Sequence, residues 1–489
     1  MQLTECILSL DIGTTHVKAF AYAKSGNVLG KASRSLAGPG AGVQDAEGVW
    51  EEVAAVLKAI ASVCAALQLT PACVSISGAM HSMLPVDGQG ISLAPARLWS
   101  DNSGATYAAS IRDTPEGKLV YQETGTPIHP MSPFIKICWL RENQPELFAS
   151  AARFISIKEY IWHKLTGSWK VDYSIASATG LFASGNLCWS ETAIRLAQIT
   201  PERLSTPVSP YYHEELLVGP LHDAGFQRTF PVVIGGNDGC LALLGSAPLR
   251  PGNISLSMGT SAAVRSVVPR FEPDPTGCTF TYLLDEHHFV AGGPSNNCGG
   301  VFSWITGLFT GTGWPDLSQL EAQNSLAAGI SPGAEGLVFI PYIFGERAPL
   351  WDAGASGSFS GIRNTHTRAH FARAAMEGVL FNLRFILELM SARTDVREIF
   401  TGGGLAAFPL WVQTLADILN YNLMHTAGKE DSSAGAALIG MKALGLISSL
   451  EDQSVFYHQP VAVLPQPEAA RIYEPLYQQF KGTVLNLTT

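Results

Sequence analysis

The segment Leu8-Ser9-Leu10-Asp11-Ile12-Gly13-Thr14-Thr15 lies near the start of a chain of 489 residues. It reads as a short buried strand that ends in a glycine turn and leads into a second β-prone stretch, residues 16–22. The same order of apolar, glycine and hydroxyl residues returns in Ile254-Ser255-Leu256-Ser257-Met258-Gly259-Thr260-Ser261, which is followed by the β-prone residues 262–268. The second copy begins about half the chain later. The sequence therefore predicts a duplicated fold with one phosphate-binding hairpin in each half.

Between and after these hairpins, strand and helix patterns alternate. Residues 48–69 carry apolar side chains at helical spacing and precede an apolar run at 73–77, and a second buried strand is predicted at 231–235. In the second half, a strand at 398–401 ends in three glycines, and a helix with proline in its first turn follows at 409–419. This alternation is typical of an α/β fold. The turn-rich residues 246–253 predict a boundary between one domain at 1–247 and another at 248–489.

Composition excludes several classes of partner. A hydrophobic content of 46% is enough for two substantial cores, and the net charge of −10 argues against nucleic acid or an anionic membrane as the main partner. An apolar run of 18 residues occurs nowhere in the sequence, and the N-terminal segment lacks the basic region of a signal peptide, so we expect a cytoplasmic protein without a membrane span. Eight scattered cysteines lack zinc spacing, which predicts buried thiols in a reducing compartment.

The first glycine turn has side chains suited to a nucleotide. Gly13 allows close approach to a phosphate, and Thr14 and Thr15 offer hydroxyl and N–H donors. Lys18 can reach a phosphate as a point charge, and Asp11 at the strand end can hold Mg²⁺ through water. An ordinary hairpin is the alternative reading, but the repetition of the motif in the second half favours a nucleotide site.

A second candidate is Asp238 in the run Val232-Val233-Ile234-Gly235-Gly236-Asn237-Asp238-Gly239. An aspartate just past the carboxyl end of a buried strand points into the crevice where α/β sheets bind ligands. Such a carboxylate can accept a hydroxyl proton as the oxygen attacks the γ-phosphorus of ATP. An Asn-Asp-Gly turn cap is the alternative. The sequence has neither a P-loop motif nor a Rossmann glycine fingerprint, which disfavours both of those classes.

Two longer segments carry a family resemblance. Met131-Ser132-Pro133-Phe134-Ile135-Lys136-Ile137-Cys138-Trp139-Leu140-Arg141-Glu142-Asn143 resembles the first signature of the FGGY carbohydrate kinases. Gly357-Ser358-Phe359-Ser360-Gly361-Ile362 and the following residues 370–377 resemble the second. The resemblance implies two actin-like, ribonuclease H-like lobes with a cleft between them, which close over ATP and a sugar. It implies a sugar side with the catalytic base in the lobe at 1–247, and a nucleotide side in the lobe at 248–489.

The resemblance also assigns roles residue by residue. It implies that Asp238 is the catalytic base and that Asp11 lies near the Mg²⁺ ion. The residues that it implies for ATP binding are Gly13, Thr14, Thr15, Lys18, Gly259, Thr260, Gly299, Gly403 and Gly404. Those that it implies for the substrate, together with Asp238, are Met80, His81, Trp99, Asp101 and His129.

Three stretches on the sugar side, residues 77–82, 99–102 and 124–131, look most like the gluconate kinases of the family. This implies phosphorylation of D-gluconate to 6-phospho-D-gluconate. One departure is that related kinases commonly place an arginine two residues after Asp101, where this chain has Ser103. Lys158, Arg347 and His129 are then the candidates for binding the substrate carboxylate.

Two other functions stay open at this point. A kinase of a ketose such as xylulose uses a similar Met-His pair, and an actin-like ATP-binding module without a sugar acceptor needs only the paired phosphate loops. Neither a nucleic acid nor a membrane is expected as a partner. A homodimer is an assembly that the sequence leaves open.

Overall fold

The computed structural model describes residues 4–38, 40, 42–215, 218–426, 430–451 and 460–486. The chain divides into two compact units. The first unit combines Met1–Leu249, Val268–Val290 and Glu430–Tyr457, and the second combines Arg250–Val267, Ala291–Lys429 and His458–Thr489. The first break falls close to the expected boundary at 247/248, which stays a prediction. Two later segments return to the first unit, and the linear division of the sequence does not include them.

The first unit is built on a six-stranded sheet with the order β13-β14-β5-β1-β2-β3. Its strands are β1 (Thr4–Ile12), β2 (His16–Tyr22), β3 (Val28–Ser35), β5 (Leu69–Gly78), β13 (His213–Glu215) and β14 (Pro231–Asn237). Strands β1, β5 and β14 are parallel, while β2 and β3 form an antiparallel meander on one side and β13 is antiparallel to β14 on the other. Most residues of the parallel strands are buried because helices cover both faces.

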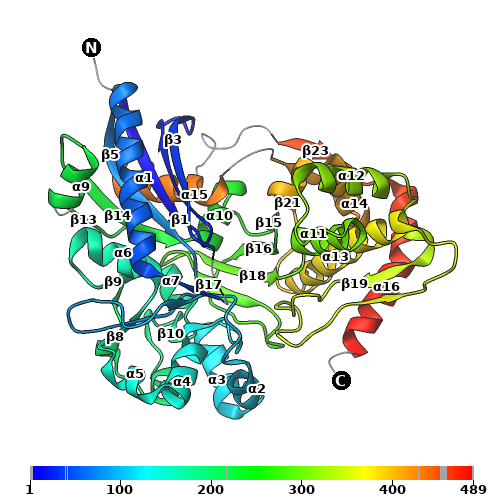
Figure 1. Ribbon diagram of the computed structural model, residues 1–489, viewed down its shortest axis with the longest axis horizontal. Helices are drawn as coiled ribbons and strands as arrows, with labels where there is room; N and C mark the ends of the chain where they lie inside the picture. The colour runs from blue at the N-terminus through cyan, green and yellow to red at the C-terminus, as the bar shows by residue number, and fades with distance from the viewer. Residues whose placement is uncertain are drawn as a thin grey trace. The chain divides into compact units, whose positions relative to one another are not determined.

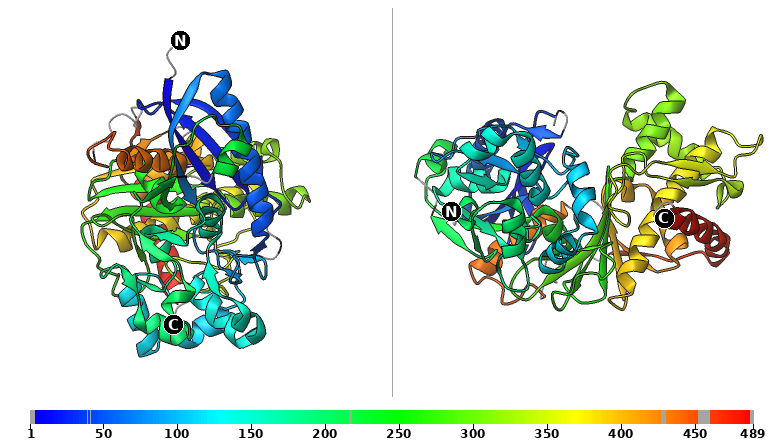
Figure 2. Two further views of the ribbon diagram at one scale, coloured as in Figure 1. Left: turned by 90° about the vertical axis from the view of Figure 1, so that its left-hand side faces the viewer. Right: turned by 90° about the horizontal axis from the view of Figure 1, so that it is seen from below.

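Helix α1 (Ala46–Ala66) packs on one face of this sheet, and α10 (Asp238–Ser246) and α15 (Asp431–Ala443) pack on the other. Figure 1 shows α1 in front of β1 and β5, and the left view of Figure 2 shows α1 (blue) and α15 (orange) on opposite sides of the strands. Asp45 caps α1 by accepting hydrogen bonds from the backbone N–H groups of Glu47 and Gly48. The apolar positions of α1 then recur at helical spacing and join the core beneath the sheet.

Shorter elements complete the first unit. They are β4 (Val43–Gln44), β6 (Leu84–Val86), β7 (Ala96–Arg97), α2 (Ala105–Arg112), α3 (Pro115–Thr124), α4 (Pro133–Asn143), α5 (Pro145–Ser150), β8 (Arg153–Ile155), α6 (Ile157–Thr166), β9 (Lys170–Asp172), α7 (Tyr173–Ser177), β10 (Phe182–Ala183), β11 (Cys188–Trp189), α8 (Glu191–Ala197), β12 (Thr206–Val208), α9 (Val218–Ala224) and β17 (Phe280–Leu283). Proline at the first position of α3, α4 and α5 suits the helix start, where its missing N–H has no intrahelical partner.

The second unit repeats the strand order of the first. Within a seven-stranded sheet, six strands follow the order β18-β16-β15-β21-β22-β23, with β15 (Asn253–Met258), β16 (Ala262–Val268), β18 (Phe289–Ser295), β21 (Glu398–Gly402), β22 (Leu423–His425) and β23 (Val461–Val463). As in the first unit, the hairpin β15–β16 is antiparallel, the strands β15, β21 and β22 are parallel, and the outermost strand, β23, is antiparallel to its neighbour. The duplicated α/β fold predicted from the two glycine hairpins is therefore confirmed.

Helices and short elements surround this second sheet. They are α11 (Gly299–Thr310), α12 (Leu317–Ala328), β19 (Val338–Ile340), β20 (Ser358–Ser360), α13 (Arg368–Ser391), α14 (Pro409–Leu419) and α16 (Pro467–Asn486), with a 3-10 turn at Gly404–Ala407. Helix α13 is buried along most of its length, and its Arg373 and Glu377 form an ion pair that also binds the hydroxyl of Tyr473 on α16. This buried triad joins the two long helices of the unit.

Other expectations from composition can be compared with the structure. Six of the eight cysteines are buried, but Cys188 is exposed and Cys278 is half-buried, so the expectation of buried thiols is wrong for these two. In the described part of the chain, the helices are either too short or too polar to traverse a lipid bilayer.

Candidate functional site

In the first unit, the carboxyl ends of three parallel strands meet at one edge of the sheet. Asp11 of β1 is level with Ser77 of β5, and Ser77 is level with Gly236 of β14. The strand β14 then ends at Asn237, and Asp238 follows as the first residue of α10. Only β5 separates β1 from β14, so the backbones of Asp11 and Gly236 lie about 10 Å apart across the sheet, and Asp238 follows two residues after Gly236. The two carboxylates singled out in the sequence thus belong to one edge.

Asp11 is almost completely buried at this edge. Its Oδ2 accepts a hydrogen bond of 3.0 Å from the hydroxyl of Ser432 on α15. Burial raises the pKa of Asp11, and the hydroxyls of Ser77 and Ser432 and the charge of Lys18 partly offset that rise. Carboxylate and hydroxyl oxygens are the donors that magnesium prefers, and the ion keeps much of its hydration shell. The oxygen-rich surroundings of Asp11 therefore fit a hydrated Mg²⁺ ion.

Two hydrogen bonds fix the backbone of the turn between β1 and β2. The N–H of Gly13 donates to the carbonyl of His16 at 3.0 Å, and the side-chain amide of Gln44 donates to the carbonyl of Thr14 at 3.1 Å. Thr15 is exposed. The ammonium of Lys18 lies 2.7 Å from a carboxylate oxygen of Glu430 on the surface, so in this structure it is paired with the protein. Exposed pairs of this kind are weak, and a phosphate could displace the glutamate.

Asp238 begins α10, and the preceding residue caps the helix. The side-chain oxygen of Asn237 accepts a hydrogen bond of 2.7 Å from the N–H of Cys240. One carboxylate oxygen of Asp238 accepts from the N–H of Gly239 at 2.8 Å, and the side chain is half-buried. Gly235 has a φ of +67°, and a Cβ there would lie 2.0 Å from the carbonyl oxygen of Ile76. Only glycine fits at this close approach of the strands β14 and β5.

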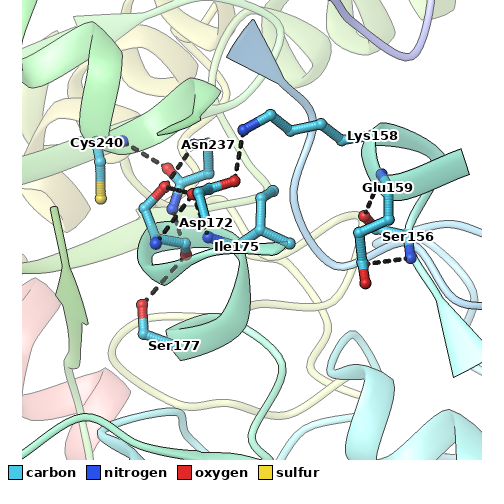
Figure 3. A network of polar contacts seen from close by, with 9 residues as sticks. Ser156, Lys158, Glu159, Asp172, Ile175, Ser177, Asn237 and Cys240 are labelled. Atoms are coloured by element: carbon cyan, nitrogen blue, oxygen red, sulfur yellow. Dashed lines mark hydrogen bonds and ion pairs between the residues drawn. The ribbon is translucent and has the colours of Figure 1, made fainter. Parts of the chain in front are cut away.

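A buried network lies behind Asn237 (Figure 3). Lys158 donates to Asp172 at 2.5 Å, and the side chains of this ion pair are only 3% and 1% exposed. The other oxygen of Asp172 accepts from the N–H and the hydroxyl of Ser174 and from the N–H of Ile175. The ammonium of Lys158, which the sequence suggested for a substrate carboxylate, is therefore committed to a carboxylate of the protein. Asp172 was not among the predicted site residues, although an aspartate directly before a helix is a common N-cap.

The loop that carries Met80 and His81 follows β5. His81 has a φ of +68°, which is uncommon for a residue other than glycine. Its Nδ1 lies 2.9 Å from the carbonyl oxygen of Ala178, so Nδ1 carries a proton, because a carbonyl can only accept. Its Nε2 lies 3.4 Å from the hydroxyl of Tyr282. Met80 is half-buried and packs against a small apolar cluster that includes Val171.

Lys136 joins this loop to a second predicted substrate stretch. Its ammonium donates to the carbonyl of His81 at 2.9 Å and also to the carbonyl of Met131. In the same stretch, Nδ1 of the buried His129 accepts from the N–H of Met131 at 3.1 Å. Burial lowers the pKa of Lys136 to about 7, while the charge of Asp101 opposes this shift. Three stretches that the sequence predicted on the sugar side thus meet around Lys136.

The third stretch contains Asp101, and a cation that the sequence analysis missed binds to it. Arg97 donates through Nη1 to Asp101 Oδ2 at 2.9 Å and to the hydroxyl of Ser103 at 3.1 Å. The guanidinium centre lies 4.0 Å from the ring centroid of Trp139. Burial would raise the pKa of Asp101, but the hydrogen bonds from Arg97 and Ser103 outweigh it, and the pKa is lowered. Arg97 therefore brings a guanidinium to Ser103, where the family pattern led us to expect an arginine. Trp99, between them in sequence, is half-buried.

A small cavity connects the phosphate hairpin with the sugar-side loop inside the first unit. Gly13 and Thr14 line it from the hairpin, Met80 and Ser82 line it from the loop, and Lys158 lines it from α6. Residues predicted for ATP and residues predicted for the sugar are therefore neighbours in the structure.

In the second unit, the predicted nucleotide residues also come together. The N–H groups of Gly299 and Gly300, at the start of α11, donate to the carbonyls of Gly259 and Thr260 at 2.9 Å each. Gly403 has a φ of +93°, and a Cβ there would lie 2.5 Å from the carbonyl oxygen of Met258. Gly404 follows directly and opens the 3-10 turn.

A buried glutamate, also missed in the sequence, anchors the loop before α11. Glu346 accepts hydrogen bonds from the hydroxyl of Ser295 at 2.6 Å and from the N–H of Asn296 at 2.8 Å, and it also binds the side-chain amides of Asn297 and Asn382. Burial raises the pKa of Glu346 to about 7, although these hydrogen bonds act to lower it. The neighbouring Arg347, a candidate for the substrate carboxylate, instead donates to the side chain of Asn296 at 2.7 Å.

Within the described ranges, no three His, Cys, Asp or Glu side chains gather as metal ligands.

Comparison with known proteins covers both units. Residues 6–245 match the model of the N-terminal domain of the FGGY family of carbohydrate kinases, and residues 254–444 match its C-terminal domain. The chain is 36% identical to a gluconokinase of Bacillus licheniformis, over 98% of this chain and 95% of that relative.

Two solved structures from Lactobacillus acidophilus have nearly the same fold. One is a ligand-bound xylulose kinase, with a TM-score of 0.92 and 27% identity over 99% of each chain. The other is a gluconate kinase, with a TM-score of 0.92 and 27% identity over 99% of this chain and 98% of that one. Fold similarity alone does not separate the two sugars, since both structures superpose equally well.

Proposed function

Because the chain belongs to the FGGY family of carbohydrate kinases, we propose that it transfers the γ-phosphoryl group of ATP to D-gluconate and forms 6-phospho-D-gluconate. The observation that carries this proposal is the similarity to a gluconokinase, at 36% identity over nearly the whole chain. The family makes ATP the phosphoryl donor. The alternative of an ATP-binding module without a sugar acceptor is set aside, because the family is one of kinases.

In the proposed reaction, Asp238 is the general base. Its carboxylate accepts the proton of the 6-hydroxyl as that oxygen forms a bond to the γ-phosphorus, and the bond from phosphorus to the β-phosphate oxygen breaks to release ADP. A positioned base contributes about 10²- to 10⁴-fold to the rate. The rest of phosphoryl transfer is alignment and neutralisation of charge. The half-buried position of Asp238 at the sheet edge is compatible with this role.

We assign the ATP phosphates to the hairpin residues Gly13, Thr14, Thr15 and Lys18 in the first unit. In the second unit we assign nucleotide binding to Gly259, Thr260, Gly299, Gly403 and Gly404. Support comes from the geometry within each unit, where the glycines allow backbone segments to approach one another closely. Asp11, with the hydroxyls of Ser77 and Ser432 beside it, would hold Mg²⁺ through water. The bound ion would neutralise charge on the phosphates.

For the substrate itself, Met80, His81, Trp99, Asp101 and His129 remain the proposed contacts. We add Arg97 as the group that binds the carboxylate. Among the described residues, Arg97 uses only Nη1 for hydrogen bonds to Asp101 and Ser103, which leaves Nε and Nη2 for a second partner. A guanidinium edge of this kind matches a carboxylate with two parallel hydrogen bonds.

A kinase of a neutral ketose such as xylulose is the second candidate. Its support is the xylulose kinase structure from Lactobacillus acidophilus, which is as similar in fold as the gluconate kinase structure. Xylulose has no carboxylate, so it would make no use of the free edge of Arg97.

ADP release over a panel of D-gluconate, D-xylulose, glycerol and other sugar acids tests the proposal. We expect the highest kcat/KM for D-gluconate, and we expect Asp238→Asn to lower kcat by about 10²- to 10⁴-fold while ATP still binds, because the base alone is removed. A higher kcat/KM for D-xylulose would replace the first candidate with the second. A variant Asp238→Asn with an unchanged kcat would remove Asp238 from the role of base.

A cytoplasmic location, the absence of nucleic-acid and membrane partners, and a homodimer stay predictions. Analytical ultracentrifugation of the purified chain measures the last of these.

A further inference from the structure

The residue that precedes the proposed base is held at three points. The N–H of Asn237 donates to the hydroxyl oxygen of Ser174 at 2.6 Å, and its side-chain amide donates to the carbonyl of Ser174 at 2.8 Å. Its side-chain oxygen caps α10 through the N–H of Cys240. The backbone and the side chain of Asn237 are therefore both fixed, and the direction in which the chain enters Asp238 is fixed with them.

Ser174 is held in turn by Asp172. The hydroxyl of Ser174 donates to Asp172 Oδ1 at 2.5 Å, which leaves the hydroxyl oxygen to accept from Asn237. The same Oδ1 accepts from the N–H groups of Ser174 and Ile175 and so caps α7. One carboxylate oxygen thus sets the orientation of the hydroxyl that Asn237 binds. Figure 3 shows Asp172 between Lys158 and Asn237.

The ion pair with Lys158 offsets the cost of burying the carboxylate of Asp172. Asp172 is 1% exposed, and a lone buried charge would be costly, but the ammonium of Lys158 lies 2.5 Å from Oδ2. Gly78 makes room for the lysine, because a Cβ on Gly78 would lie 2.8 Å from Lys158 Cδ. Gly236 similarly lies against Ser174, where a Cβ would come within 3.0 Å of the hydroxyl oxygen. The small residues of β5 and β14 thus admit this polar network between the sheet and α7.

We propose that Asp172 is a positioning residue, which acts through Ser174 and Asn237 to hold Asp238 at the distance and angle needed for proton abstraction. The inference rests on the proposed function, in which Asp238 is the base. A displacement of about 1 Å at a reacting group can cost about 10²-fold in rate. Positioning of the base acts on the chemical step, so its loss lowers kcat and leaves the KM for sugar and ATP nearly unchanged.

The first experiment compares two serine-to-alanine variants. Ser174→Ala removes the hydroxyl between Asp172 and Asn237, and we expect kcat to fall about 10- to 100-fold, with each KM within about threefold of the wild type. Ser190→Ala is the matched control, because Ser190 is also a buried serine whose hydroxyl donates to a carboxylate, that of Glu123, and accepts from a backbone N–H, that of Ala193. We expect Ser190→Ala to keep the wild-type kcat even if its melting temperature falls.

The second experiment separates the hydrogen bonds from the ion pair. In the double variant Lys158→Met/Asp172→Asn, the amide oxygen of the new asparagine can still accept from Ser174 and Ile175. In Lys158→Met/Asp172→Ala that acceptor is gone, while the ion pair is absent from both. We expect the first double variant to keep kcat within about fivefold of the wild type and the second to lose about 10- to 100-fold.

The outcomes separate this inference from the proposed function. If Ser174→Ala keeps kcat within twofold of the wild type, or if the two double variants share one kcat, Asp172 does not position the base. If Ser174→Ala does not fold, the two double variants decide, with binding of an ATP analogue as the measure of folded protein. If the wild type prefers another sugar, gluconate phosphorylation fails, and the same variants are compared on that sugar. An active Asp238→Asn enzyme would overturn both assignments.

Discussion

At the scale of single residues, two cations in the first unit have different environments. Arg97 lies half-buried against Trp139 and donates to Asp101 and Ser103 through Nη1 alone. Lys136 is 1% exposed and donates to two backbone carbonyls instead of a carboxylate. Arg97 is therefore suited to recognise an anion, whereas Lys136 connects two loops.

Arg97→Met should therefore weaken binding of the acid more than binding of a neutral polyol. The methionine keeps apolar contact with Trp139 but loses the bidentate donors, and hydrogen bonds to charged groups are worth about 1.5–3 kcal/mol. We expect Kd for D-gluconate to rise about 10- to 100-fold and Kd for D-sorbitol, which lacks the carboxylate, to rise much less. Isothermal titration calorimetry with both ligands measures the ratio. An equal rise of Kd for both ligands would mean that Arg97 only holds Asp101 in place and does not bind the carboxylate of the substrate.

Lys136→Met should make stability depend on pH in a defined direction. The pKa of Lys136 is about 7 in the folded protein, below its ordinary value of 10.5, because burial disfavours the charge; Asp101 and Arg97 are the charges that face it. The folded state therefore releases this proton near pH 7, while the unfolded state keeps it. A neutral amine still has two N–H donors for its two carbonyls.

The lysine thus contributes stability that is complete above pH 10.5 and is lost as pH falls through 7. We expect the free energy of unfolding of the wild type, relative to Lys136→Met, to increase by about 2.5 kcal/mol between pH 6 and pH 9, since the proton is released over about two pH units of that range and each unit corresponds to about 1.4 kcal/mol. Urea denaturation at both pH values measures this difference. A difference that is constant with pH would mean that Lys136 keeps its proton in the fold.

At the scale of elements, the crossing of α10 and α15 depends on glycine. A Cβ on Gly245 of α10 would lie 2.0 Å from the carbonyl oxygen of Asp431, and one on Gly435 of α15 would lie 2.1 Å from that of Leu241. Both obstacles are backbone atoms, which no rotamer change can relieve. The two helices therefore pack backbone to backbone on the sheet face below Asp11 and Asp238.

Gly435→Ala should destabilise the protein, although alanine is the better helix former. Overpacking costs about 1–3 kcal/mol, against a gain of about 1 kcal/mol in helix propensity. Gly482→Ala on α16 is the matched control, because a Cβ there meets no atom within 4 Å, and the gain in propensity should appear alone. Urea denaturation of the two variants should give shifts of opposite sign. A stabilised Gly435→Ala would show that the helices can separate at little cost.

Elements with a local pattern could be predicted well from the sequence. The second strand of each hairpin and α14 begin and end where their patterns indicated, at 16–22, 262–268 and 409–419. Polar side chains that act over long separations could not be predicted. Lys158 and Asp172 lie on different elements, and Glu346 binds Asn296 fifty positions away, so no periodicity pairs them. Arg97 was missed because the family pattern directed attention to the residues after Asp101 and not before it.

At the scale of the whole molecule, duplication could be read from the hairpins, because each copy has to end a buried strand in a tight turn. The sequence did not indicate which segments belong to which unit. Residues 268–290 and 430–457 lie after the boundary in the sequence but belong to the first unit. Whether such a segment packs on one sheet or another depends on tertiary contacts, which the local pattern does not encode.

The three-segment first unit has a consequence for biosynthesis. Domains usually fold in order as the ribosome delivers them, the N-terminal one first. Here the sheet that carries Asp11 lacks α15 on one face until translation has passed residue 443. The apolar face of β1 and β5 that α15 covers therefore stays exposed for most of synthesis, and a chaperone that binds apolar surface would contact it before α15 exists.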